Sequence, residues 1–155
     1  MHHSFVYNNV WLWTAFFAWV LAQLTKMLCG YTRTRKLDFR YLVSTGGMPS
    51  AHSALVSSVA TAVGMTEGFQ TPLATLAIVV AGVTMFDAST VRHAAGQQAR
   101  LLNEIVEELF HAHHFSERKL KELLGHTRLE VFMGMVMGIL TAMLVVSRCY
   151  LPVQG

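Results

Sequence analysis

The chain has 155 residues, of which 53% are hydrophobic and only 14% are charged. A soluble domain carries about 25% charged residues, and one of this size could not bury half of its residues in a single core. The positive mean hydropathy of +0.41 also excludes a disordered chain. The composition therefore predicts a small integral membrane protein that forms one domain over residues 1–155.

Four stretches without Asp, Glu, Lys or Arg are long enough, or nearly so, to cross a membrane as helices. These stretches are residues 5–25, 41–66, 68–86 and 131–147. The first lacks a basic n-region and an A-x-A cleavage signal, which argues against a signal peptide. We expect an all-α, polytopic bundle with four transmembrane helices over about residues 9–30, 50–65, 72–93 and 126–147.

The segment before the last span predicts a cytoplasmic amphipathic helix. Its apolar stripe consists of Leu101, Leu102, Ile105, Val106, Leu109 and Phe110. Its polar face consists of Arg100, Asn103, Glu104, Glu107 and Glu108. This helix would lie on the membrane surface or pack on the bundle. A short helix over residues 116–124 would follow, capped by Ser116.

The second expected span carries small residues at every fourth position, Ala54, Ser58 and Ala62. Such a stripe lets two helices pack closely in lipid. Its partner is either another helix of the same chain or a second copy, so a homodimer is a possibility.

The basic residues set the expected orientation. Of the 12 Lys and Arg residues, only Arg148 falls outside when the loop after the first span is cytoplasmic. This distribution predicts a multi-pass protein of a bacterial inner (cytoplasmic) membrane with both termini external. Topology and contact with anionic membrane lipids explain the basic pI of about 9.1, so no nucleic-acid partner is expected.

Polar side chains near the spans converge on the cytoplasmic ends of the helices, and ionisable groups at membrane depth are functional candidates. They are Lys26, Ser50, His52, Asp87, Arg92, His126 and Glu130. The sequence Gly46-Gly47-Met48-Pro49-Ser50 precedes a helix whose free N–H groups and positive dipole end suit phosphate. The alternative is an ordinary Gly-Pro loop in which His52 only caps the helix.

His126 and Glu130 lie one helical turn apart, so the carboxylate can orient the imidazole. His126 could then act as a nucleophile toward phosphorus. The alternative is a surface pair at a helix start. Arg92 suits phosphate, and Asp87 would orient a neighbouring cation or serve structure. The histidines near residue 113 lack accompanying metal ligands, so no metal site is expected.

These motifs resemble one known family. Residues 46–53, 87–92, 95–99 and 123–131 are similar to the divergent branch of the type 2 phosphatidic acid phosphatase superfamily, which includes lipid phosphate phosphatases and vanadium haloperoxidases. The superfamily motif P-S-G-H is matched by Pro49-Ser50-Ala51-His52, and H-x3-D by His126 with Glu130. The first motif, K-x6-R-P, pairs Lys26 with Arg33 or, equally well, with Arg35-Lys36. Leu120 stands where the third motif has arginine, and Arg92 is our preferred substitute over Lys121.

The resemblance implies a metal-independent membrane phosphatase without a cofactor. His126 would form a phosphohistidine, Glu130 would orient it, and His52 would protonate the leaving group. The developing charge would be stabilised by Lys26, Arg35, Ser50, Arg92 and the backbone of Gly46 and Gly47. The substrate would be a lipid phosphate or diphosphate. Two alternatives remain, a protein that binds lipid phosphate without turnover and a small transport or assembly subunit.

Overall fold

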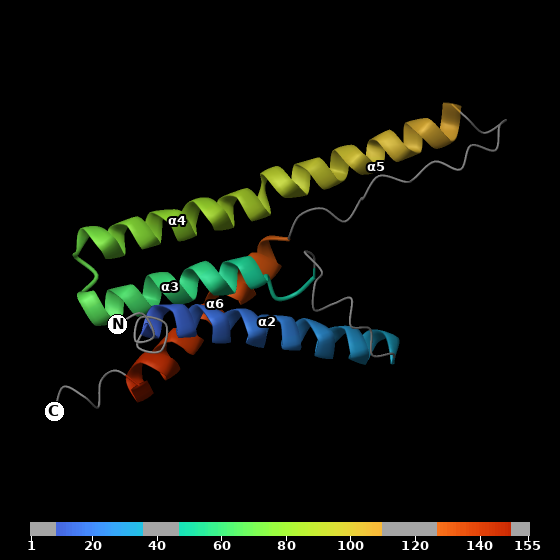
Figure 1. Cartoon of the computed structure of the whole chain (residues 1–155). Helices are drawn as coiled ribbons and strands as arrows, with labels where there is room; N and C mark the ends of the chain where they lie inside the picture. The colour runs from blue at the N-terminus through green and yellow to red at the C-terminus, as the bar shows by residue number, and fades with distance from the viewer. Residues whose placement is uncertain (1–8, 36–46, 110–126, 150–155) are drawn as a thin grey trace, which may run out of the picture.

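The computed structural model describes residues 9–35, 47–109 and 127–149, and every regular element in these ranges is an α-helix (Figure 1). The helices are α2 (Val10–Thr34), α3 (Ala51–Glu67), α4 (Pro72–Ser89), α5 (Val91–Leu109) and α6 (Arg128–Cys149). The prediction of an all-α membrane helix bundle is confirmed. Gly46, His126 and the predicted helix at residues 116–124 lie outside the described residues.

Three segments of the described chain are long and apolar enough to cross a membrane, Val10–Thr32, Pro72–Val106 and Arg128–Cys149. The remaining expected span corresponds to α3, which has 17 residues. That length lies at the lower limit for crossing a hydrocarbon core of about 30 Å. The third expected span corresponds to α4 and the start of α5, since the apolar segment Pro72–Val106 continues past the break at Thr90 and Arg92 belongs to the first turn of α5.

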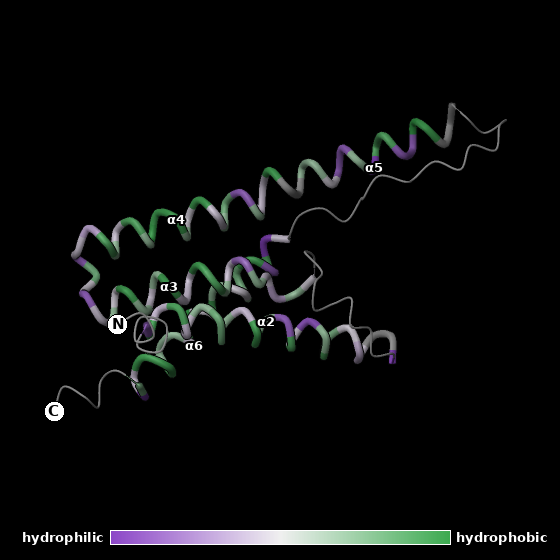
Figure 2. Tube along the Cα trace, in the orientation of Figure 1, coloured by the Kyte–Doolittle hydropathy of each residue, from purple (hydrophilic) through white to green (hydrophobic). Residues whose placement is uncertain are grey.

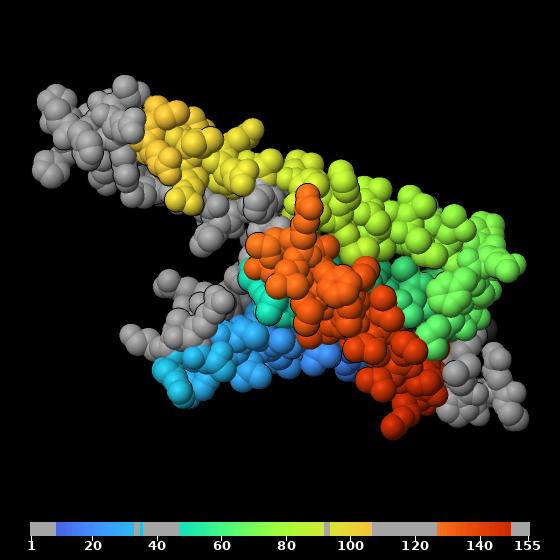
Figure 3. All heavy atoms as spheres, turned by 180° about the vertical axis from the view of Figure 1, so that it is seen from behind, coloured from blue at the N-terminus to red at the C-terminus, as the bar shows by residue number. Residues whose placement is uncertain are grey.

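The helix α3 lies at the centre of the bundle and packs against α2, α4 and α6. The chain direction of α2 and α4 is opposite to that of α3, whereas α6 runs in the same direction (Figure 1). Seen from behind, α6 lies across α3 between α2 and α4 (Figure 3). The start of α2 and the end of α6 therefore lie at one end of the bundle, and the starts of α3 and α6 lie at the other.

Local sequence signals fix most of the helix ends. The side chains of Asn9, Ser50 and Thr71 each accept a hydrogen bond from a first-turn N–H group of α2, α3 and α4, respectively. Such caps satisfy donors that have no partner inside the helix. Pro72 occupies the first turn of α4, where its missing N–H costs nothing.

The contact between α3 and α6 is unusually close because α6 presents glycine at two successive turns. A Cβ atom on Gly134 would collide with the carbonyl oxygen of Ser50, and one on Gly138 would collide with the Ser57 hydroxyl and the Ala54 carbonyl. The Ser57 hydroxyl also lies 3.1 Å from the carbonyl oxygen of Met135 on α6. We call this contact the α3–α6 seam. Its small residues bring the two backbones together as in other closely packed membrane helices.

The stripe of small residues on α3 is buried inside the chain. Ala54, Ser58 and Ala62 have no exposed surface. Ala54 packs with Ala22 of α2, and Ala62 packs with Ala142 and Val146 of α6. The interpretation as an intramolecular contact is confirmed, and the stripe is not free to hold a second copy.

Beyond the bundle, α5 continues in nearly the direction of α4 and extends away from the other helices (Figure 1). Hydrophilic and hydrophobic residues alternate along it, whereas α4 is mostly hydrophobic (Figure 2). The side chains of Leu101, Leu102 and Ile105 are at least half exposed. The predicted amphipathic character is present, but the alternative in which this helix packs on the bundle is wrong for the described residues.

Candidate functional site

The starts of α3 and α6 are joined by a hydrogen bond. The backbone N–H of Ser50 donates to the carbonyl oxygen of Glu130 over 3.0 Å. Since α3 and α6 run in the same direction (Figure 1), the positive ends of both helix dipoles lie side by side. We call this place, with Ser50, Glu130 and the neighbouring Lys26, the α3–α6 junction. An anion is the natural counter-charge for such an arrangement.

Lys26 supplies a buried positive charge at the junction. It lies in α2, and only 3% of its surface is exposed. The Glu130 carboxylate is close enough to attract its ammonium group electrostatically. A buried charge is costly unless it is paired, and this attraction offsets part of the cost of burying the lysine. One acidic side chain thus balances Lys26 and part of the two helix dipoles.

Glu130 also closes the first turn of α6 in a capping box. Its carboxylate accepts a hydrogen bond from the Thr127 N–H over 3.0 Å, and the Thr127 hydroxyl oxygen accepts one from the Glu130 N–H over 3.3 Å. The T-x-x-E spacing is the usual signature of this motif. The carboxylate predicted to orient His126 is therefore bound to the residue that directly follows it.

Ser50 is the N-cap of α3 and is completely buried. Its hydroxyl oxygen accepts hydrogen bonds from the Ser53 N–H over 3.3 Å and from the Ser53 hydroxyl over 3.0 Å. The hydroxyl predicted to bind phosphate thus holds the start of the helix. Two residues further on, the side chain of His52 is exposed in the first turn of α3. The structure thus places this imidazole two residues after Ser50 of the junction.

Three other predicted site residues, Gly47, Asp87 and Arg35, lie in the described part of the chain outside this junction. Gly47 is exposed and has a φ of 94°, a backbone conformation that glycine adopts easily. Asp87 is half-buried in the last turn of α4. Arg35 is exposed at the end of α2, about 13 Å further along the helix axis than Lys26. The structure therefore groups Lys26, Ser50 and Glu130 and separates Arg35 from them.

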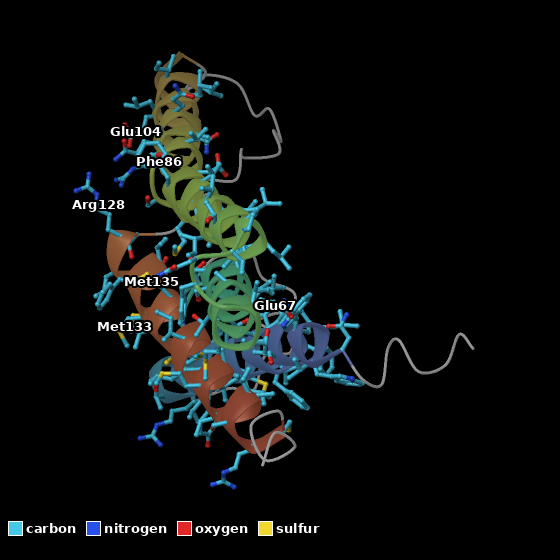
Figure 4. The ribbon with its side chains drawn as sticks, turned by 90° about the vertical axis from the view of Figure 1, so that its left-hand side faces the viewer. Glu67, Phe86, Glu104, Arg128, Met133 and Met135 are labelled. Carbon is cyan, nitrogen blue, oxygen red and sulfur yellow. The ribbon has the colours of Figure 1, made fainter. Side chains whose placement is uncertain are left out.

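Arg128 illustrates how the junction differs from the surface beside it. It occupies the first position of α6, and its side chain points away from the other helices (Figure 4).

Within the described ranges, no group of three or more His, Cys, Asp or Glu side chains is arranged to hold a metal ion.

Two features of this region are not among the predicted site residues. The capping box has a direct signal in the spacing of Thr127 and Glu130. Gln23 is a carboxamide inside an apolar span, three residues before Lys26, and polar groups at membrane depth are functional candidates. It is 6% exposed, and its Oε1 atom has no hydrogen-bond partner among the described residues.

Comparison with known proteins identifies the family of this chain. The profile of a family described as "Divergent PAP2 family" matches residues 7–141. The chain belongs to this divergent PAP2 family. It is also 38% identical over 144 residues to "Uncharacterized membrane protein YuiD" of Bacillus subtilis (strain 168), an alignment that covers 86% of this chain and 91% of that protein. No solved structure matches. The resemblance inferred from the sequence motifs is thereby confirmed at the level of the family.

Proposed function

We propose that this protein is a membrane-embedded phosphatase that hydrolyses a lipid phosphate or diphosphate through a phosphohistidine. The observation that carries this proposal is the α3–α6 junction, where two helix N-termini and the buried Lys26 gather positive charge beside Glu130. Such a site attracts a phosphate group and stabilises the charge that develops during its transfer. Membership of the divergent PAP2 family supports this chemistry.

In the first step of the proposed reaction, His126 attacks phosphorus, a P–N bond forms, and the P–O bond to the lipid breaks. His52, exposed in the first turn of α3, gives its proton to the leaving oxygen. Water then attacks phosphorus, a new P–O bond forms, and the P–N bond to His126 breaks. His52 takes up a proton from that water, and inorganic phosphate leaves. Lys26 and the positive N-terminal end of the α3 dipole stabilise the phosphoryl oxygens, together with Gly47 and, from outside the described residues, Gly46. In this scheme Arg92 is a further phosphate contact, and Arg35 meets the outer part of a diphosphate.

The membrane setting defines the proposed substrate class. The protein is an integral membrane protein, and we infer that the junction lies at the cytoplasmic face of a bacterial inner membrane with both termini external. Eleven of the 12 basic residues lie on that side in this topology. A phosphate attached to a lipid would then be at the depth of Lys26 while its chains stay among the surrounding membrane lipids.

The proposal is tested by phosphate release from short-chain phosphatidate and a polyprenyl diphosphate, with the purified protein in detergent. We expect turnover by the wild-type chain, its inhibition by vanadate, its loss in His126→Ala, and a large decrease in His52→Ala. The Arg148→Ala variant is a matched control because this exposed cation lies at the opposite end of α6. Undiminished turnover by His126→Ala would contradict the mechanism.

A second candidate is a protein that binds lipid phosphate without hydrolysing it. This function is favoured by the structural use of two predicted groups, since the Ser50 hydroxyl caps α3 and the Glu130 carboxylate caps α6. It predicts saturable binding of lipid phosphate that depends on Lys26, with no phosphate release from either lipid.

A further inference from the structure

The carboxamide of Gln23 is a polar group that the proposed mechanism does not use. Its Oε1 atom is buried and, among the described residues, accepts no hydrogen bond. A buried acceptor without a donor destabilises the folded chain, because it loses its hydrogen bonds to water without a replacement. An apolar side chain at position 23 would avoid this cost. The presence of glutamine there therefore points to a hydrogen-bond donor that arrives with a ligand.

The position of Gln23 ties it to the α3–α6 junction. Residues three apart in a helix share one side, so Gln23 lies on the same side of α2 as Lys26. It precedes Lys26 by about 4.5 Å along the axis, on the membrane side of the ammonium group. At the same level, Ala22 packs against Ala51 and Ala54 in the first turns of α3. The carboxamide is therefore buried on the same side of α2 as Lys26, at the level of the first turns of α3.

Among the described residues, the hydroxyl groups of this region are already directed to other acceptors. The Ser53 hydroxyl donates to the Ser50 hydroxyl, and the Thr25 hydroxyl donates to the Leu21 carbonyl. The single proton of the Ser57 hydroxyl is directed to backbone carbonyl oxygens. The buried residues in the first turns of α6, Val131 and Gly134, have no side-chain donor.

We propose that Gln23 is a specificity residue whose Oε1 atom accepts a hydrogen bond from the P–OH group of a singly protonated phosphate monoester. Lys26 then faces an ionised oxygen of the same phosphate, and Gln23 faces the protonated one. The inference rests on the proposed function, since it assumes that the junction holds phosphate. It narrows the substrate class to monoesters in the monoanionic form, because a fully ionised phosphate offers no donor to a carboxamide oxygen.

The test compares two ligands of equal charge by titration calorimetry on the full chain in non-ionic detergent. Octyl phosphate at about pH 5 is mostly a monoanion with one P–OH, since its second pKa is about 6. Octyl sulfate is a monoanion without such a donor. We expect the wild-type chain to bind octyl phosphate about tenfold more tightly, as one hydrogen bond to a buried acceptor implies.

The variant Gln23→Met keeps the length of the side chain and removes the acceptor. We expect it to bind octyl sulfate as the wild type does and to lose the preference for octyl phosphate. Thr14→Val is the matched control, because Thr14 is a buried polar residue of α2 far from the junction. A preference that survives in Gln23→Met, or an equal loss of affinity for both ligands, would overturn the proposal.

A second measurement needs no variant. Raising the pH from about 5 to about 8 removes the P–OH proton, so the ratio of octyl phosphate to octyl sulfate affinity should fall. Lys26, His52, Asp87 and Glu130 are the titratable groups of the described helices in this region, and their titration acts on both ligands. A ratio that rises with pH would show that charge alone governs binding and would overturn the role of Gln23. If the wild type binds both ligands equally, this inference fails while the phosphate site stands, whereas binding of neither contradicts the proposed function itself.

Discussion

The α3–α6 seam and the arm formed by α4 and α5 differ in the size and exposure of their apolar side chains. The seam is built from Gly134, Gly138 and small residues of α3, so that the two backbones touch. On the α4 part of the arm, Ala74, Ala81 and Ala88 are buried, and large side chains such as Leu76 and Val83 are exposed. In a membrane protein such exposure is compatible with contact to lipid.

This difference indicates where the positions of the helix backbones must be closely fixed. At the seam, a shift of one backbone would move Ser50, Glu130 and the first turn of α3 together, because all are linked by hydrogen bonds. Along the arm, the exposed side chains can be substituted without displacing another helix. A site that must hold charged groups in fixed positions is best supported by closely packed elements, and the junction lies at one end of the seam.

The largest expected effect is on catalysis at the junction. Replacing Lys26 with Met removes the buried cation, and the loss of such a charge costs about 100- to 1,000-fold in turnover. Phosphate release from short-chain phosphatidate measures this loss. Arg148→Met removes an exposed cation at the other end of α6 and should leave turnover unchanged. Equal rates of phosphate release by the two variants would contradict a role of the junction in the mechanism.

The next effect contrasts a glycine of the seam with a glycine of the arm. A methyl group on Gly134 meets the Ser50 carbonyl, whereas one on Gly82 of α4 meets nothing within 4 Å. We expect Gly134→Ala to lower the free energy of unfolding by about 2–3 kcal/mol, the cost of overpacking. Gly82→Ala should raise it by up to about 1 kcal/mol through helix propensity. Unfolding in mixed detergent micelles gives both values, and a stabilising Gly134→Ala would contradict the close contact.

A smaller effect separates the two threonine caps. Thr127 takes part in a reciprocal capping box with Glu130, whereas Thr71 caps α4 through Ala74 alone. Thr127→Ala should cost about 1–2 kcal/mol and Thr71→Ala about 1 kcal/mol or less. Glu130→Gln keeps an acceptor for the Thr127 N–H, so its stability should change less than that of Thr127→Ala. A Glu130→Gln chain that unfolds as easily as Glu130→Ala would show that charge, not the cap, is the main role of this residue.

The smallest effect is expected on the arm. The Leu76 side chain is 60% exposed, so Leu76→Ala should change the free energy of unfolding by about 0.5 kcal/mol or less in detergent. The same unfolding assay measures it. A loss of several kcal/mol would reveal that this face of α4 is covered in the protein's working state.

Much of the fold could be predicted because charge-free runs are direct signs of membrane helices. The order of helices and the stripe of Ala54, Ser58 and Ala62 follow from such local patterns. The end of α4 could not be predicted, since no Gly or Pro marks Thr90, where the helix is interrupted. The helix that packs against Gly134 and Gly138 could not be predicted either, because a sequence shows which residues are small but not which helix approaches them.

The candidate site was only partly accessible from the sequence. Convergence of Lys26, Ser50 and Glu130 follows from topology, because the C-terminal half of α2 and the N-termini of α3 and α6 lie toward the same end of the bundle. The hydrogen bonds that occupy Ser50 and Glu130 depend on the distance between α3 and α6, which no motif encodes. The sequence marks Gln23 as a polar residue inside an apolar span, but only the structure shows that its buried oxygen lacks a donor among the described residues.

Direct detection of the covalent intermediate tests the central claim best. The purified protein is mixed with short-chain phosphatidate, quenched in alkali to preserve phosphohistidine, digested, and analysed by mass spectrometry. The account predicts a phosphoryl group on the peptide that contains His126, with more of it in His52→Ala if that residue also activates the hydrolytic water. Sustained phosphate release with the phosphoryl group on another residue, or on none, would contradict the account.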